Sequence, residues 1–159
     1  MKIGLYKHAV LISFIFSTGP LLIHGDEPDK RVSWKTITLA GAEDRPAPGA
    51  DQATALDNEK NYFVKKKDSV AGLGVKVAKL TSYGGKTQLY VAVNQKDALR
   101  LRQFFHSHVG GYIALMCVGN LLACAFVQTD DDIRSDFTIS VASKEIGNRL
   151  LQAMEERPK

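Results

Sequence analysis

Two histidines, His106 and His108, have the His-x-His spacing that can hold a zinc ion. The motif works on a strand, where both imidazole rings face one side and reach one tetrahedral site. Here Leu101 and Phe105 recur at helical spacing just before it, and on a helix residues two apart point about 200° away from each other. We therefore expect the rings to lie apart near a helix C-terminus, where the helix dipole favours imidazolium. We predict no metal site.

Three consecutive carboxylates form the second candidate. Oxygen ligands of this kind suit calcium, but the spaced D-x-D-x-D-G loop and its closing Glu are missing. A solvated acidic loop is the simpler interpretation, and we predict that this loop contacts a basic protein partner. The predicted partner-binding residues are Asp130, Asp131, Asp132, Arg134 and Asp136.

Nucleophilic catalysis has little support in the sequence. There is no G-x-S-x-G motif, and Cys117 and Cys124 lie in apolar segments, where the pKa of a thiol rises and its reactivity falls. As diagonal neighbours on a hairpin the cysteines would be about 7–8 Å apart, at the limit for a disulfide, and only a shifted register would oppose them directly. We predict two buried free thiols, no catalytic residue and no cofactor. The alternative is a small metal-dependent hydrolase that uses both histidines and the acidic loop.

The first 25 residues have the layout of a secretory signal peptide. Lys2 and Lys7 precede a short apolar run, Ala9–Phe16, and the small residue Gly25 stands at the predicted cleavage point. The run is shorter than the about 20 apolar residues that span a bilayer. We predict a periplasmic or secreted protein with residues 1–25 removed and no stable membrane insertion afterwards. The alternatives are an uncleaved anchor and a buried N-terminal helix.

The charge balance argues against nucleic-acid binding. The 159 residues include 21 basic and 17 acidic side chains, and removing residues 1–25 takes away two lysines and no acid. The excess is small, and the only basic cluster is Lys65-Lys66-Lys67, which we interpret as a solvated turn or strand edge. We predict a protein partner and no nucleic acid.

Alternating apolar residues and turn signals predict strands over Val32–Leu39, Gln88–Val93 and Phe137–Val141. Pro46 and Pro48 mark residues 40–60 as a linker or long loop, with a possible short helix over 53–60.

Two helices and an apolar hairpin complete the predicted elements. Asn94 is the expected N-cap of the first helix, which Gly110-Gly111 ends, and Ser143 is the expected N-cap of the second. Between them, Tyr112–Val118 and Leu121–Val127 form a hairpin so apolar that at least one face must be covered. The predicted class is α+β: an antiparallel sheet of about four to six strands with two helices packed on one face.

This order of elements resembles the head region of the periplasmic domain in the SecD and SecDF protein-export subunits, over Leu89–Met154. The resemblance rests on a helix stop, two strands around a glycine turn, an Ile-Ser step and a final helix. These are His108-Val109-Gly110, Tyr112–Val118, Gly119, Leu121–Ala125, Thr138-Ile139-Ser140 and Lys144–Met154. The sequence departs from the family in having Val118 where the turn usually has Asp, and in lacking a proline around Ala123–Ala125.

The resemblance implies an α+β fold and a place in the cell envelope. We divide the chain into a signal peptide over 1–25, an N-terminal strand plus flexible loop over 26–69, and a SecD-head-like domain over 70–159. The predicted function is that of an exported, non-catalytic protein-binding module, in a specific version an immunity or inhibitor protein that neutralises a secreted toxin or enzyme. The alternative from the resemblance is an accessory factor in protein export or envelope assembly.

Overall fold

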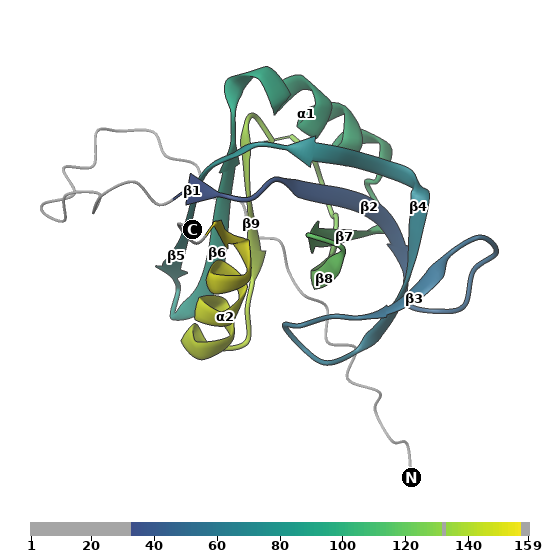
Figure 1. Ribbon diagram of the computed structural model, residues 1–159, viewed down its shortest axis with the longest axis horizontal. Coiled ribbons are helices and arrows are strands. Elements are labelled where there is room, and N and C mark those ends of the chain that lie inside the picture. Colours follow the sequence, from purple (N-terminus) through teal and green to yellow (C-terminus); the bar gives the residue numbers. More distant parts are fainter. Residues whose placement is uncertain (1–32, 132, 157–159) are drawn as a thin grey trace, which may run out of the picture.

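The computed structural model describes residues 33–131 and 133–156, so the predicted signal peptide lies outside the described residues. The described chain forms ten strands, a 3-10 helix and two α-helices, arranged as Figure 1 shows. The strands are β1 Ser33–Trp34, β2 Ile37–Glu43, β3 Asp51–Thr54, β4 Asn61–Leu73, β5 Val75–Tyr83, β6 Lys86–Val93, β7 Tyr112–Cys117, β8 Asn120–Phe126, β9 Asp136–Ser140 and β10 Glu155–Glu156. The helices are η1 Gln95–Asp97, α1 Ala98–Ser107 and α2 Lys144–Met154.

Five strands form an antiparallel sheet in the order β3-β4-β2-β7-β8. The expected long loop over 40–60 is wrong at its start and in its middle, because residues 40–43 belong to β2 and residues 51–54 form β3. The expected short helix over 53–60 is also absent from this described stretch. Pro46 and Pro48 lie in the connection between β2 and β3, where a missing N–H removes no ladder hydrogen bond.

A β-bulge at Leu122 curls this sheet toward closure. The pairing of β7 with β8 shifts by one residue there, from Leu115 opposite Ala123 to Met116 opposite Leu121. As a result the carbonyls of Leu121 and Leu122 both accept hydrogen bonds from the chain that follows β3: from the N–H of Leu56 at 3.1 Å and from the N–H of Asp57 at 3.0 Å. These two bonds join the segment that follows β3, at one edge of the sheet, to β8 at the other edge.

The remaining strands form a three-stranded antiparallel sheet, β5-β6-β9, and a short β1-β10 pair. Helix α1 contacts β4, and helix α2 contacts β5 and β6. Gly147 allows α2 to approach closely, since a Cβ there would lie 2.5 Å from the Leu80 side chain. The predicted α+β class is confirmed, with the strands divided between these sheets.

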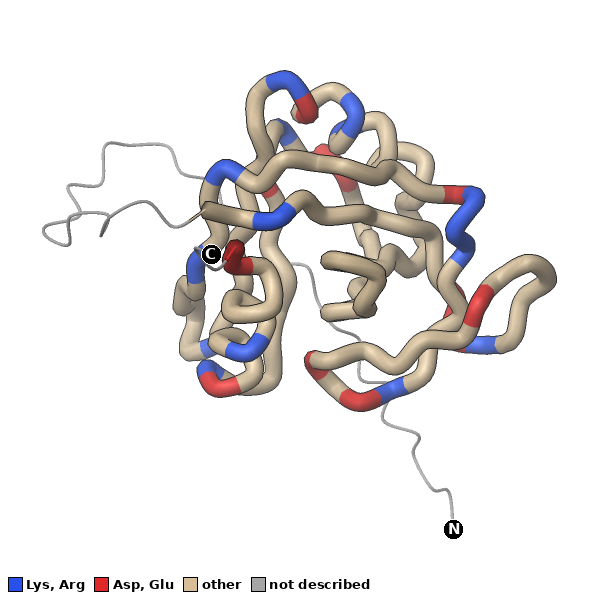
Figure 2. Tube along the Cα trace, viewed as in Figure 1, with Lys and Arg blue, Asp and Glu red and all other residues tan. Residues whose placement is uncertain are grey.

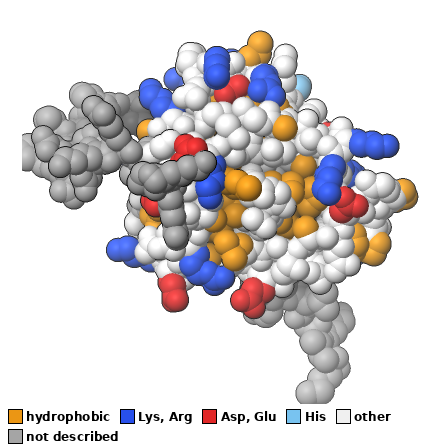
Figure 3. Space-filling model, in the orientation of Figure 1, with side chains coloured by type: hydrophobic (Ala, Val, Ile, Leu, Met, Phe, Trp, Pro, Cys, Tyr) orange, Lys and Arg blue, Asp and Glu red, His pale blue; other side chains and the backbone are white. Residues whose placement is uncertain are grey.

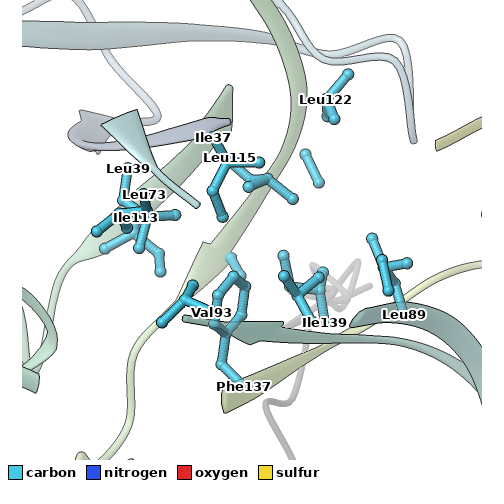
Figure 4. Packing of buried hydrophobic residues seen from close by; sticks show 14 of the residues in the cluster. Ile37, Leu39, Leu73, Leu89, Val93, Ile113, Leu115, Leu122, Phe137 and Ile139 are labelled. Atoms are coloured by element: carbon cyan, nitrogen blue, oxygen red, sulfur yellow. The ribbon is translucent and has the colours of Figure 1, made fainter. Parts of the chain in front are cut away.

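Apolar side chains form two separate clusters on the two faces of the curled sheet. The larger lies between the five-stranded and three-stranded sheets and includes Ile113 and Leu115 of β7 (Figure 4). The smaller lies inside the curl and includes the alternate β7 residues Ala114 and Met116. The apolar hairpin is therefore covered on both faces, which explains why its sequence is almost continuously apolar.

Candidate functional site

The two histidines contact different aspartates. The Nδ1 atom of His106 lies 2.7 Å from Asp130 Oδ2 at the surface, whereas the Nε2 atom of His108 lies 2.9 Å from Asp68 Oδ2 on β4. His108 is the C-cap residue of α1, as predicted for a histidine at this helix end. Within the described residues, no group of three or more His, Cys, Asp or Glu side chains is placed to hold a metal ion.

His108 fastens the end of α1 to the curled sheet. Its Nδ1 atom faces the carbonyl of Phe104 at 2.7 Å, and its ring stacks on that of Phe104 with centroids 4.0 Å apart. Both partners of the ring, a carbonyl and a carboxylate, are hydrogen-bond acceptors, so each ring nitrogen of His108 faces an oxygen atom. Gly41 of β2 makes room for the pair, because a Cβ there would lie 2.5 Å from Asp68 Oδ2 and 3.1 Å from His108 Nε2.

Ser107, His108 and Asp68 together resemble a catalytic triad in composition but not in arrangement. Ser107 Oγ lies 3.0 Å from His108 Nδ1 and donates to the Phe104 carbonyl at 2.8 Å. The Nδ1 atom faces that same carbonyl, so in this arrangement it offers no lone pair to accept a proton from the serine. The contacts therefore cap the helix.

The predicted partner-binding loop is partly occupied by contacts of its own. Asp130 pairs with His106, and Asp131 Oδ2 accepts from Thr129 Oγ1 at 2.8 Å. Asp136 accepts a hydrogen bond from Tyr90, and burial, with this bond as a smaller cause, raises the pKa of Tyr90 to about 12. Arg134 is exposed, and Asp132 lies outside the described residues.

The basic cluster is largely neutralised across neighbouring strands. Lys65 pairs with Glu43 of β2, and Lys66 lies 2.7 Å from Asp51 of β3. Figure 2 shows basic and acidic residues interspersed along the described trace.

Both cysteines are buried and free, as predicted. Cys117 belongs to the larger apolar cluster and Cys124 to the smaller one, so they lie on opposite faces of the sheet. Burial raises the pKa of both thiols, most strongly that of Cys124.

A groove of about 490 Å³ lies where the chain after β3 meets β8 and α2. Sequence reasoning missed it, because its walls come from three separate segments and no local motif marks them. Figure 3 shows hydrophobic side chains gathered in the hollow between α2 and the curled sheet. The residues that line it are Thr54, Ala55, Leu56, Glu59, Asn120, Leu121, Leu122, Arg149 and Ala153.

The turn between β7 and β8, just before the groove residue Asn120, carries an exposed apolar residue in a strained conformation. Val118 is 71% exposed and has a φ of 49°, and Gly119 follows with a φ of 78°. Two positive φ values suit Asn-Gly or Asp-Gly, whereas a β-branched residue is disfavoured there.

No helix among the described residues is long and apolar enough to cross a bilayer.

No protein-family model and no curated protein matches the chain in sequence. Two solved structures that are similar to it are both of SecDF. One, of a membrane component SecDF that enhances protein export, is 11% identical, with a TM-score of 0.47 over 77% of this chain and 64% of that one. The other, SecDF in a super-membrane-facing form, is 11% identical, with a TM-score of 0.48 over 76% of this chain and 19% of that one. The chain thus matches less than two thirds of the length of either. SecDF is also the family that the sequence resembles.

Proposed function

We propose that this chain is a non-catalytic binding module of the cell envelope whose ligand is an extended polypeptide segment with apolar side chains, held in the groove between α2 and β8. The groove itself is the observation that carries the proposal. Its volume of about 490 Å³ falls in the range of ligand sites, and apolar side chains dominate its floor.

The surroundings of the groove favour a polypeptide over a small molecule. Glu59 and Arg149 place one charge of each sign at the groove, where they can pair with a basic and an acidic residue that flank an apolar segment. Val118, two residues before the groove residue Asn120, adds an exposed apolar side chain to the hairpin turn.

The acidic loop stays as the alternative contact surface. Asp130, Asp131, Asp132, Arg134 and Asp136 are proposed to bind a basic partner, with exposed Arg134 and Asp131 the most accessible of the described members. The two surfaces imply different partners, since the loop suits a folded protein with a basic patch.

The same distinction separates the two roles in the envelope. An accessory factor in protein export would bind extended chains through the groove, whereas an immunity or inhibitor protein would bind one folded toxin or enzyme. The groove supports the first role, and we propose it ahead of the second.

Fluorescence anisotropy with a labelled, unstructured peptide tests the groove. The peptide carries Leu and Val residues between one Asp and one Lys. We expect Ala153→Trp, which fills the groove, to weaken binding at least 10-fold. The matched control is Asn148→Trp, which adds the same side chain at an exposed position of α2 outside the groove.

Arg134→Glu distinguishes the two surfaces. Unchanged peptide binding by this variant supports the groove. If Arg134→Glu abolishes binding and Ala153→Trp has no effect, the groove proposal is wrong and the loop takes its place.

A further inference from the structure

Asp57 is a buried carboxylate with an unpartnered oxygen. It is 7% exposed, and its Oδ1 atom has no hydrogen-bond partner within the described structure. Such an atom costs free energy unless the group changes its protonation state or finds a partner. The mechanism proposed for the groove does not use Asp57, so its burial needs a separate explanation.

Asp57 sits in the turn over residues 55–60, which forms one wall of the groove. Ala55, Leu56 and Glu59 of this turn all line the groove. The turn closes on itself through a hydrogen bond from the N–H of Glu59 to the carbonyl of Ala55 at 2.9 Å, with Glu59 at a φ of 59°. We call residues 55–60 the latch turn.

The latch turn is joined to β8 by two backbone hydrogen bonds, those that Leu56 and Asp57 donate to Leu121 and Leu122. One of the two donors is thus the residue that carries the buried carboxyl group. Any free energy that Asp57 loses or gains on burial acts directly on the docking of this wall.

We propose that Asp57 is a proton-controlled latch: the protonated carboxyl holds the turn over residues 55–60 against β8 and completes the groove wall, and its ionisation loosens that wall. This inference rests on the proposed function, because it describes the regulation of the same groove.

The titratable groups around Asp57 agree with this role. Lys60 in the same turn attracts the ionised form, whereas Tyr62 of β4 and Cys124 of β8 offer no positive charge. Burial is the largest influence and raises the pKa of Asp57 to about 6, against the opposing effects of two backbone N–H groups and Lys60.

The sign of the effect follows from this direction. A carboxyl group whose pKa is 3.8 in the open turn and about 6 in the docked turn binds its proton more tightly when docked. Docking is therefore strongest at low pH and weakens between about pH 4 and pH 6. The total loss is roughly 100-fold in the docking equilibrium, since each pKa unit corresponds to a factor of ten.

Hydrogen exchange of backbone amides, followed by NMR from pH 4 to pH 7 and corrected for intrinsic exchange rates, tests the latch without any ligand. We expect protection of the Leu56 and Asp57 amides to fall by up to roughly 100-fold over this range. The control is the Gly110 amide, which donates to the Val127 carbonyl and should show no such loss. In Asp57→Asn, protection of the amides at positions 56 and 57 should be independent of pH.

A second variant keeps the test informative if Asp57→Asn folds poorly. Lys60→Gln removes the attractive charge, so the loss of protection should extend to higher pH than in the wild type. Unchanged protection of the wild-type amides between pH 4 and pH 7 would overturn the latch, as would an identical pH profile in Lys60→Gln.

The latch and the groove fail independently. If protection of the Leu56 and Asp57 amides does not change with pH while Ala153→Trp abolishes peptide binding, the latch proposal is wrong and the groove proposal is supported. If the amides respond to pH while Ala153→Trp binds the peptide normally, the reverse holds.

Discussion

At the residue scale, Gly41 determines how closely α1 can be tied to the curled sheet. The Asp68 carboxylate and the His108 ring meet directly above its Cα atom, so any side chain at this position competes with their contact. The absence of a Cβ at Gly41 thus allows the Asp68–His108 contact, which holds the C-terminus of α1 against the central strand β2.

We expect Gly41→Ala to lower the free energy of unfolding by about 1 kcal/mol, because the Asp68 side chain must move away from His108. Urea titration measures the loss. In a double-mutant cycle, Asp68→Ala should cost less in the Gly41→Ala background than in the wild type. Gly111→Ala is the matched control, since the nearest atom to its Cβ would lie at an ordinary 3.4 Å. Additive effects of the two substitutions would refute the link.

Val118 has a positive φ, which is unfavourable for a β-branched residue. Replacing it by Asn should raise the free energy of unfolding by about 1 kcal/mol, because Asn accepts a positive φ more easily than a β-branched residue. The melting temperature reports this gain. If Val118 contacts the ligand, the same variant should bind the peptide more weakly while being more stable. A variant that loses stability would show that Val118 makes a compensating contact.

Part of the chemistry of these residues could be predicted from the sequence. Helical geometry alone predicted that His106 and His108 point apart, and the separation expected for Cys117 and Cys124 on the hairpin predicted free thiols. The partner of His108 could not be predicted, because Asp68 lies 40 residues away and reaches it only through the pairing of β4 with β2. The groove escaped prediction for the same reason.

At the element scale, the helix ends show where local signals suffice. Ser143 caps α2 as predicted, with its Oγ atom accepting from the N–H of Ile146 at 3.2 Å. Asn94 was also expected to cap a helix, but it precedes the 3-10 helix and its side chain makes no capping hydrogen bond. The nearby Asp97 instead stabilises the corner between β4 and β5. It is 4% exposed and accepts a hydrogen bond from the N–H of Gly74 at 2.9 Å.

We expect Asp97→Ala to lower the free energy of unfolding by about 2 kcal/mol, since it leaves the Gly74 N–H without its acceptor and Arg100 without its buried partner. Asp97→Asn keeps an acceptor for Gly74 and should cost clearly less. Both are measured by chemical denaturation. Equal losses in the two variants would mean that the charge, and not the hydrogen bond to the corner, stabilises this region.

Strands at the N-terminal end of the chain were harder to predict than the helices and the apolar hairpin. Residues 40–43 read Ala-Gly-Ala-Glu, which has low strand propensity, and they become a strand because β4 and β7 pair with them on both sides. The small residues Ala40 and Ala42 fit the narrow interior of the curl. Tertiary pairing therefore overrides the local signal here.

At the scale of the whole molecule, the central position of β2 bears on the predicted division at residues 69 and 70. Ile37 and Leu39 of β2 are fully buried in the larger cluster, together with residues of β6, β7 and β9. The larger core is therefore shared by segments from both sides of the division, and most of β4 lies before it.

We therefore expect residues 70–159 expressed alone to lack a cooperative fold, although they contain all of Leu89–Met154, the segment whose sequence resembles SecD. The truncation removes β2, β3 and most of β4, so it exposes the apolar inner face of β7 and takes away its neighbour β2 in the sheet. Circular dichroism and the dispersion of amide NMR signals measure this, with residues 26–159 as the matched control. A fragment that melts cooperatively would instead establish residues 70–159 as an independent domain. The groove then could not form in it, because Leu56 and the latch turn would be missing.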